Sequence, residues 1–361
     1  MNCARTKAFG RWLMTGLLVI GYSDTARAID FEDNEVWRFA DSGGNNAMCA
    51  QGGDIDNDGD TDVIVKYGQT GKIGWFENYG GCGEKWWTNA CSARFTQICT
   101  SYGGYSMFVA DMDGDDDFDV VASGPHPSIS KTVPGWWENS SNGTSWSFHM
   151  IYDPVGTSSW VEPADIDDDG DMDVACAEWG KILWVELNDG APVSTNVLDS
   201  PGTWNSWCAH PAQLDGDAEL EIVGAWYYGS YINKQVVIYQ IGGGTTVLST
   251  NSLNGPWRVW CFDADGDDDL EVAVCASSVT KVWENTTNWP VLMNDTSGGA
   301  ACLHSGDLDG DGDEELVAGD NYYDFTTMGW TNYDAGTLGT SWSTYTFDVI
   351  DVDGDEDLAA R

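Results

Sequence analysis

The feature that most constrains the fold is an acidic phrase that recurs seven times along the chain. Its first copy, Asp54 to Asp62, reads DIDNDGDTD, and the β-branched run Val63-Ile-Val follows at once. Further copies start at Asp111, Asp165, Gln213, Asp263, Asp307 and Asp351, at intervals of 57, 54, 48, 50, 44 and 44 residues. A period of this size predicts a repeat architecture in which similar supersecondary units stack on one another.

The acidic phrase has the chemistry of a cation-binding loop. Five carboxylates within nine residues repel one another unless a cation neutralises them, and apolar stretches on both sides hold each loop in place. Calcium accepts roughly 6–8 oxygen ligands in a flexible shell, whereas magnesium demands stricter octahedral geometry, so calcium is favoured. An EF-hand is excluded because position twelve is Val65, Ala122 or Cys176 instead of a glutamate, and the flanks read as strands.

The net charge of −44 is concentrated in these loops, which hold 38 of the 59 acidic residues. The other 21 acids face 15 basic residues, an ordinary balance. The charge therefore predicts bound cations. It disfavours a nucleic-acid partner, because no basic patch is present to neutralise phosphates.

The N-terminus predicts export. Arg5, Lys7 and Arg11 precede an apolar run from Trp12 to Gly21, and Ala26-Arg-Ala28 resembles a cleavage site. This pattern is that of a secretory signal peptide spanning residues 1–28, and the run is too short to cross a bilayer. We expect a mature chain of residues 29–361 that has no transmembrane segment and is secreted or held at the cell surface.

Nine cysteines remain after residue 28, an odd number that cannot all pair internally. Cys82 and Cys91 bracket a short loop and are the best disulfide candidates, with Cys99 as a rival partner. Cys49, Cys208 and Cys302 each lie five residues before a loop start, which favours three equivalent buried positions over disulfides.

The segments between the loops read as short strands with turns of Gly, Asn and Ser. The first repeat has four, near Ala47-Met-Cys-Ala, Asp62 to Tyr67, Gly71 to Asn78 and Arg94 to Cys99. Four strands in each repeat of about 50 residues, with no helical periodicity, predict an all-β fold, a β-propeller of four-stranded blades. The isolated strand at residues 35–40 is expected to complete the last blade and close the ring.

A second phrase follows the loops on a later strand. It reads Trp75-Phe-Glu-Asn78, Trp136-Trp-Glu-Asn139, Trp184-Val-Glu-Leu-Asn188 and Val282-Trp-Glu-Asn285. The sixth repeat has the weaker Gly329-Trp-Thr-Asn332, and the fourth has Val236-Val-Ile-Tyr239. Together, loop and strand resemble the FG-GAP/VCBS repeat family, and also the calcium-binding blades of integrin α-subunits and of some fungal lectins. The resemblance covers roughly Phe31 to Arg361 and implies a calcium-loaded propeller, usually of seven blades.

The resemblance also implies a ligand set, namely the acids at loop positions one, three, five and nine and the backbone carbonyl of position seven. In the first three loops these acids are Asp54, Asp56, Asp58 and Asp62; Asp111, Asp113, Asp115 and Asp119; and Asp165, Asp167, Asp169 and Asp173. In the fifth and sixth they are Asp263, Asp265, Asp267 and Glu271, and Asp307, Asp309, Asp311 and Glu315.

Two loops depart from this pattern. The fourth opens with Gln213 and keeps only Asp215, Asp217 and Glu221, and the seventh keeps Asp351, Asp353 and Asp355 but has Ala359 at position nine. We expect about one Ca²⁺ per loop, bound more weakly at these two. The chain ends soon after the seventh loop starts, which predicts six complete repeats and a truncated seventh blade.

A candidate ligand site lies just before the loops. His210 and His304 both lie three residues before a loop start, where other repeats have Glu162 and Trp260. If this position faces the channel, these four residues converge near Arg258; the alternative is two buried, hydrogen-bonded histidines. The recurring tryptophans Trp75, Trp136, Trp184, Trp283 and Trp330 are interpreted as blade core, whereas the irregular Trp160, Trp207, Trp257 and Trp260, with Trp86 and Trp87, are candidates for a binding surface.

The sequence favours a binding or adhesion module for glycans or an extracellular protein. Calcium in such a module either only holds the hairpins together or also bridges to the ligand. A polysaccharide-active lyase or hydrolase with its site at the channel mouth is an alternative, although the chain has no Gly-x-Ser-x-Gly, His-Glu-x-x-His or phosphate-loop motif. A structural domain of a larger surface protein is a third reading.

Overall fold

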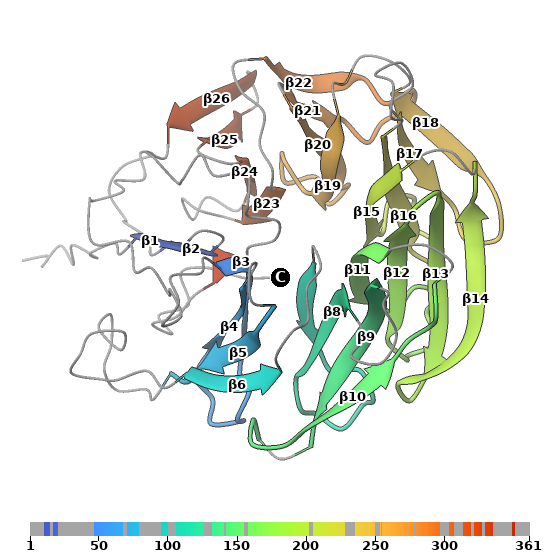
Figure 1. The fold of residues 1–361 in the computed structure, drawn as a ribbon. Coiled ribbons are helices and arrows are strands. Elements are labelled where there is room, and N and C mark those ends of the chain that lie inside the picture. Colours follow the sequence, from blue (N-terminus) through green and yellow to red (C-terminus); the bar gives the residue numbers. More distant parts are fainter. Residues whose placement is uncertain are drawn as a thin grey trace, which may run out of the picture.

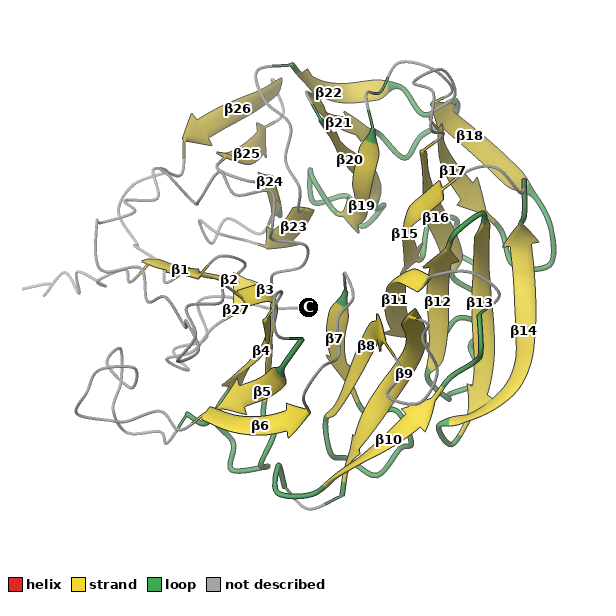
Figure 2. Cartoon of the chain, in the orientation of Figure 1, coloured by secondary structure: helices red, strands yellow, loops and turns green. Residues whose placement is uncertain are grey.

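A computed structural model describes most of the repeat region. The described residues are 47–67, 71–78, 95–99, 106–125, 132–140, 142–154, 158–201, 205–227, 235–249, 253, 255–277, 279–296, 303–306, 313–318, 321–326 and 329–334, with strand backbone at 11–14, 17–20 and 349–350. This part of the chain forms six four-stranded antiparallel sheets and contains no helix (Figure 2). It also contains no helix of the length and apolarity needed to cross a membrane.

Each sheet is one blade, and its strands follow the chain order. The first two blades are β3 (Ala47–Gly53), β4 (Asp62–Tyr67), β5 (Ile73–Phe76) and β6 (Phe95–Cys99), then β7 (Met107–Ala110), β8 (Asp119–Pro125), β9 (Thr132–Asn139) and β10 (Trp146–Met150). The third and fourth are β11 (Ser158–Ala164), β12 (Asp173–Glu178), β13 (Lys181–Asn188) and β14 (Ala191–Asp199), then β15 (Asn205–Ala212), β16 (Glu221–Tyr227), β17 (Gln235–Tyr239) and β18 (Thr245–Ser249).

The fifth blade consists of β19 (Pro256–Phe262), β20 (Glu271–Ala276), β21 (Val279–Trp283) and β22 (Val291–Asp295). The sixth consists of β23 (Leu303–Gly306), β24 (Glu315–Ala318), β25 (Asn321–Thr326) and β26 (Gly329–Asp334). Figure 1 shows the blades following one another around a central axis, from the blue β3 to the red β26, with the first strand of each blade innermost. The architecture is therefore the expected β-propeller.

The ring closes through a seventh inner strand. The two-residue β27 (Val349–Ile350) directly precedes the seventh acidic phrase, and it contacts both β3 and β23. It pairs with β2 (Leu17–Ile20), which pairs with β1 (Arg11–Met14). Six blades and the first strand of a seventh fit the expected seven-bladed ring with a truncated last blade. β1 and β2 lie within the predicted signal peptide, whose removal stays a prediction.

The second strand of each blade explains the β-branched runs that follow the acidic loops. Strands β4, β12, β20 and β24 are buried along their whole length, since each lies between two strands of its own sheet and packs against a neighbouring blade. Such a strand reads as a continuous apolar run instead of an alternating one. The largest apolar cluster joins the third, fourth and fifth blades and includes Trp184, Trp226 and Trp283.

One sequence assignment is wrong in register. The Gly329-Trp-Thr-Asn332 segment was expected to be the third strand of the sixth blade, but it forms the outer strand β26. The third strand is β25, where Tyr323 pairs with Leu316 just after the sixth loop. Asp324 therefore occupies the place that Glu77 holds in the first blade, where Phe76 pairs with Val63.

Some expectations fall outside the described residues. These are the strand at residues 35–40, the Cys82–Cys91 pair, Trp86, Trp87 and Cys302. Among the described cysteines, Cys49 and Cys208 are buried, as expected for equivalent positions on the inner strands.

Candidate metal loops and channel residues

Five described loops connect the first and second strands of their blades, so they lie at the same end of the ring. Within each loop, the position-one side chain accepts backbone N–H groups from positions further on. In the first loop, Asp54 Oδ1 accepts from Asp58 at 3.0 Å and Asp54 Oδ2 from Gly59 at 2.9 Å. The position-five carboxylate accepts from position seven, as Asp58 does from Asp60 at 3.0 Å. These bonds fold the loop and leave Oδ1 of the position-three Asp56 without a hydrogen-bond partner among the described residues.

The loops turn at positions four and six, where the backbone is left-handed. The two positions are Asn57 (φ 57°) and Gly59 (94°) in the first loop, and Gly114 (73°) and Asp116 (68°) in the second. Glycine occupies only one of the two positions in each of these loops, and Asn or Asp, which tolerate this conformation, occupy the other.

The position-nine carboxylate is buried and forms hydrogen bonds with both the loop and the third strand. Asp62 is fully buried and accepts the N–H of Ile55 at 3.0 Å and the N–H of Asn78 at 2.7 Å. Asp119, Asp173 and Glu271 accept equivalent pairs of backbone bonds. Burial raises the pKa of Asp62 to about 8 and the pKa of Asp119 to about 7. These groups therefore fix the loop in addition to any role as ligands.

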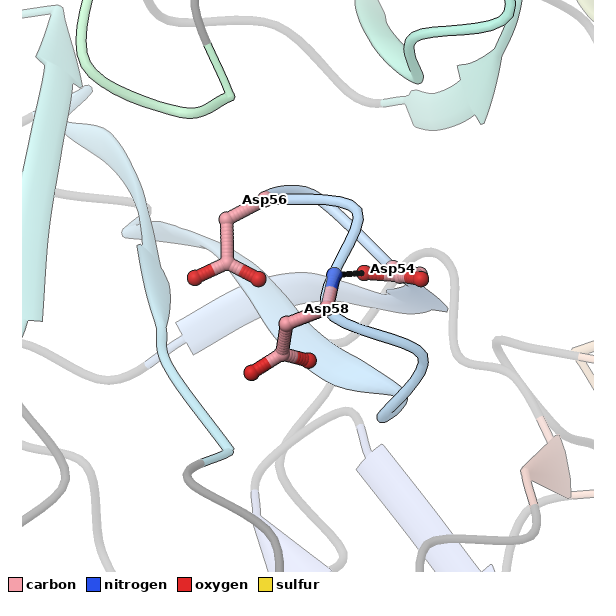
Figure 3. Close-up of side chains that lie close together, drawn as sticks. All are labelled: Asp54, Asp56 and Asp58. Carbon is pink, nitrogen blue, oxygen red and sulfur yellow. Dashed lines mark hydrogen bonds between the residues drawn. The ribbon is translucent and has the colours of Figure 1, made fainter.

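Carboxylate oxygens gather within 4.8 Å of one another in each described loop. The groups are Asp54, Asp56 and Asp58; Asp111, Asp113 and Asp115; Asp165, Asp167 and Asp173; Asp215, Asp217 and Glu221; and Asp263, Asp265 and Glu271. In Figure 3 the carboxylates of Asp56 and Asp58 lie near each other, and Asp54 accepts the backbone N–H of Asp58. The predicted ligands of these five loops are thus brought together, apart from Asp62, Asp119, Asp169 and Asp267, which these groups omit.

A loop that binds a cation is expected to have a ligand oxygen that no hydrogen-bond donor satisfies. The first three loops have such an oxygen at position three. Oδ1 of Asp56, Asp113 and Asp167 is buried and has no hydrogen-bond partner among the described residues. A buried carboxylate oxygen without a donor is costly. Burial and then the neighbouring carboxylates raise the pKa of all three groups. A divalent cation supplies the missing partner, so the donor set fits calcium.

The glutamate of the second phrase also faces the loop. Glu77, Glu138 and Glu186 follow the third-strand residues that pair just after position nine. Burial contributes most to the raised pKa of Asp56, Asp113 and Asp167, and the position-five acid of the same loop contributes second. The charge of the glutamate is the third contribution. Sequence reasoning recognised the phrase but gave this glutamate no role. Its recurrence one or two residues before the asparagine was the available signal.

The asparagine of the phrase ties neighbouring blades together. Asn139 Nδ2 donates to the Ile55 carbonyl of the previous loop at 2.8 Å, while its backbone N–H donates to Asp119 of its own loop at 2.7 Å. Asn285 repeats the contact with the Leu214 carbonyl at 2.8 Å. One residue thus fixes two acidic loops. In the sixth loop only Asp313, Glu314 and Glu315 are described, and Asp307, Asp309 and Asp311 lie outside the described residues, as do Asp351, Asp353 and Asp355.

The candidate channel residues form a chain across four inner strands. His210 Nδ1 lies 2.8 Å from Glu162 Oε1, and Trp160 Nε1 donates to Glu162 Oε2 at 2.9 Å. The Trp260 ring stacks on His210 and also packs against His304, with 4.5 Å between ring centroids in each case. The two histidines therefore do not meet, because an indole lies between them. Both are buried and hydrogen-bonded, and His304 Nδ1 contacts the Ser305 carbonyl at 2.8 Å.

Arg258 contacts three tryptophans. Its guanidinium carbon lies 4.1 Å from the centre of the Trp160 ring. Its Nη1 donates to the Trp257 carbonyl at 3.0 Å and to the Trp207 carbonyl at 3.4 Å. Arg258 is itself buried, so it fixes the backbone that carries both indoles.

Aromatic side chains gather at the other end of the strands from the acidic loops. Trp207 and Trp257 lie near the starts of β15 and β19, with ring centroids 5.1 Å apart, and Tyr227 ends β16 with its ring 6.3 Å from Trp257. All three are half-buried. We call Trp207, Tyr227 and Trp257 the aromatic cluster. The recurring Trp75, Trp136, Trp184 and Trp283 are buried, as expected for blade core.

Comparison with known proteins agrees with this geometry. A family model of FG-GAP-like repeats matches residues 54–122 and 165–224. No curated protein sequence matches the chain significantly.

Solved structures share the fold at low identity. The structure of a lectin from Agrocybe aegerita, which describes specific recognition of non-reducing terminal N-acetylglucosamine, matches with a TM-score of 0.52 and 13% identity over 95% of each chain. The structure of the Dos1 propeller matches with a TM-score of 0.52 and 9% identity over 81% of this chain and 72% of that one. At such identities the likeness concerns the fold alone. The chain thus carries FG-GAP-like repeats at residues 54–122 and 165–224 within a β-propeller of four-stranded blades, which is consistent with the FG-GAP/VCBS repeat family.

Proposed function

We propose that the protein is an exported, calcium-loaded propeller that binds a glycan at its aromatic cluster. The observation that carries this proposal is the grouping of Trp207, Tyr227 and Trp257 at one end of the channel. Half-buried aromatic rings offer flat apolar faces with polar edges. Pyranose rings present a C–H face of matching shape, so such a cluster suits a sugar.

Two further features support the proposal. Arg258 holds the carbonyls of Trp207 and Trp257, which keeps both indoles in place before a ligand arrives. Preorganisation of this kind lowers the entropic cost of binding. A lectin also shares the fold, so terminal N-acetylglucosamine is a reasonable first probe.

Calcium has a structural role in this proposal. The unpartnered oxygens of Asp56, Asp113 and Asp167 call for a cation. Because these loops join the inner strand to the second strand, ions there stabilise the first three blades, and the third of these packs against the fourth blade, which carries Trp207 and Tyr227. Metal binding and folding are coupled in such sites.

The test is a glycan array of the full chain in calcium and in EDTA, with intrinsic tryptophan fluorescence recorded to establish folding. We expect binding in calcium. Trp207→Ala and Trp257→Ala are each expected to weaken binding roughly three- to tenfold, the equivalent of about 0.7–1.4 kcal/mol. Phe118→Ala is the control, since Phe118 is a 39% exposed aromatic in an acidic loop at the opposite end. Undiminished glycan binding by both tryptophan variants would contradict the assignment.

A polysaccharide-active enzyme is the second candidate because of one contact. The Glu162 carboxylate lies 2.8 Å from His210 Nδ1, an arrangement that orients an imidazole for proton transfer. Release of new reducing ends from a polysaccharide, lost in His210→Asn and kept in Phe118→Ala, would favour the enzyme over the binding module.

A further inference from the structure

The fourth blade differs from the others at two positions that are far apart in sequence. Loop position one is Gln213, where the other described loops have aspartate. On the third strand, Tyr239 pairs with Ile222 just after position nine, so the next residue, Gln240, occupies the place of Glu77, Glu138, Glu186 and Glu284. Two carboxylates are thus replaced by two neutral amides that face the same loop.

The amide of Gln213 fills the inside of its loop. Its Oε1 accepts the N–H groups of Asp215 at 3.2 Å and Gly216 at 2.7 Å, as the position-one carboxylate does elsewhere. Its Nε2 donates to the carbonyl of Asp217 at 2.6 Å and to the carbonyl of Glu219 at 3.1 Å. Glu219 is position seven, whose carbonyl is the expected backbone ligand of the cation. An amide nitrogen therefore contacts an oxygen that a cation needs.

The amide of Gln240 satisfies the position-three carboxylate. Gln240 Nε2 donates to Asp215 Oδ2 at 3.0 Å, and the N–H of Asp217 donates to Asp215 Oδ1 at 3.2 Å. Both oxygens of Asp215 thus have donors. In the first three loops, one oxygen of the equivalent Asp56, Asp113 and Asp167 has none among the described residues.

We propose that the fourth loop takes no cation, because the side-chain amides of Gln213 and Gln240 replace it. The inference rests on the proposed calcium loading of the other loops. Asp215, Asp217 and Glu221 do lie within 4.8 Å of one another, and the sequence alone predicts a weaker calcium site there. Proximity of acids is not sufficient, however, because N–H donors already contact both Asp215 oxygens and the Glu219 carbonyl, which a cation would otherwise contact.

The replacement has a consequence for the proposed glycan site. The fourth blade carries Trp207, Tyr227 and His210, and its core joins the third and fifth blades in the largest apolar cluster. A blade whose acidic loop is closed by its own amides keeps that loop folded when calcium is low. The fourth blade, which carries two of the three residues of the aromatic cluster, thereby depends less on the ion than the first three blades do.

The experiment counts calcium ions by native mass spectrometry of the full chain, with calcium as the only added ligand. Asp215→Asn is expected to leave the number of bound ions unchanged. Asp167→Asn, the same change at the same loop position of the third blade, is expected to lower it by one. The double variant Gln213→Asp, Gln240→Glu restores the carboxylates of the other blades and is expected to raise the number by one.

Two results would overturn the inference: loss of one ion in Asp215→Asn, or an unchanged number in the double variant when its tryptophan fluorescence matches that of the folded parent. Failure of the underlying calcium proposal gives a different pattern. The parent, Asp167→Asn and the double variant would then all bind no ion, and the amides would have no cation to replace.

Discussion

Asp113→Asn distinguishes a metal ligand from a structural acid. In the absence of calcium, the two roles predict opposite signs for the change in unfolding free energy. Asp113 Oδ1 is buried without a hydrogen-bond partner among the described residues. Burial, and then Asp115, Glu138 and Asp111, raise its pKa. Removing its charge in EDTA therefore relieves repulsion without breaking a described hydrogen bond to Oδ1.

The expected sizes follow from these contacts. In EDTA the variant gains about 0.2–1 kcal/mol of unfolding free energy, the usual worth of a partly exposed charge pair. When free calcium is one hundred times its dissociation constant, the loss of one binding site lowers the unfolding free energy by about 2.7 kcal/mol. The stability difference between variant and parent thus changes sign between the two buffers.

The assay is urea denaturation followed by tryptophan fluorescence, in calcium and in EDTA. Asp116→Asn is the matched control, since Asp116 is an exposed residue of the same loop at φ 68°, a conformation that asparagine also tolerates. We expect no change for the control in either buffer. An equal loss of stability for Asp113→Asn in both buffers would refute the ligand role and leave a structural one.

Three further changes test how the blades pack. Gly143→Ala is expected to lower the unfolding free energy by more than about 2 kcal/mol, because the left-handed backbone alone costs about 1–2 kcal/mol and the new Cβ would lie 2.5 Å from Trp75. Gly242 is also left-handed but has open space around it, so Gly242→Ala should lose only the backbone contribution in the same urea assay. Lys66→Ala should cost at least about 2 kcal/mol by urea denaturation, since the fully buried ammonium donates to two carbonyls of the second blade. Tyr239→Phe should lower thermal stability by about 1–3 kcal/mol, because its hydroxyl links the fourth blade to Asp199 of the third, and an unchanged melting curve would contradict that link.

The repeat period made most of the fold predictable. Acidic loops followed by β-branched runs located the boundary between the first and second strands of each blade, and the structure places β4, β8, β12, β16, β20 and β24 there. The sixth blade shows the limit of phrase matching. Gly329 to Asn332 resembles the third-strand phrase, yet the register is set by pairing with β24, which selects Tyr323 and Asp324. Only two residues of the chain separate β24 from β25, and no side-chain pattern in the sequence indicates so short a connection.

The sequence predicted which residues make up the candidate site, but it predicted fewer of the contacts between them. Equal spacing before the loops placed Glu162, His210, Trp260 and His304 at one level of the inner strands. It did not say that the indole of Trp260 separates the histidines. The double role of the position-nine acid was also hidden, because its backbone partner on the third strand lies 14 to 20 residues away in the chain.

The geometry also decides between the two roles that calcium had in the sequence interpretation. The acidic loops follow the ends of the inner strands, whereas the aromatic cluster lies near their starts. On strand β15, Trp207 lies six residues before Gln213, which at ~3.3 Å per residue corresponds to about 20 Å. That separation is about two and a half Debye lengths at physiological salt. A calcium ion in a loop therefore neither touches a sugar at the aromatic cluster nor attracts it through the field, so any calcium dependence of binding there must act through the folding of the blades.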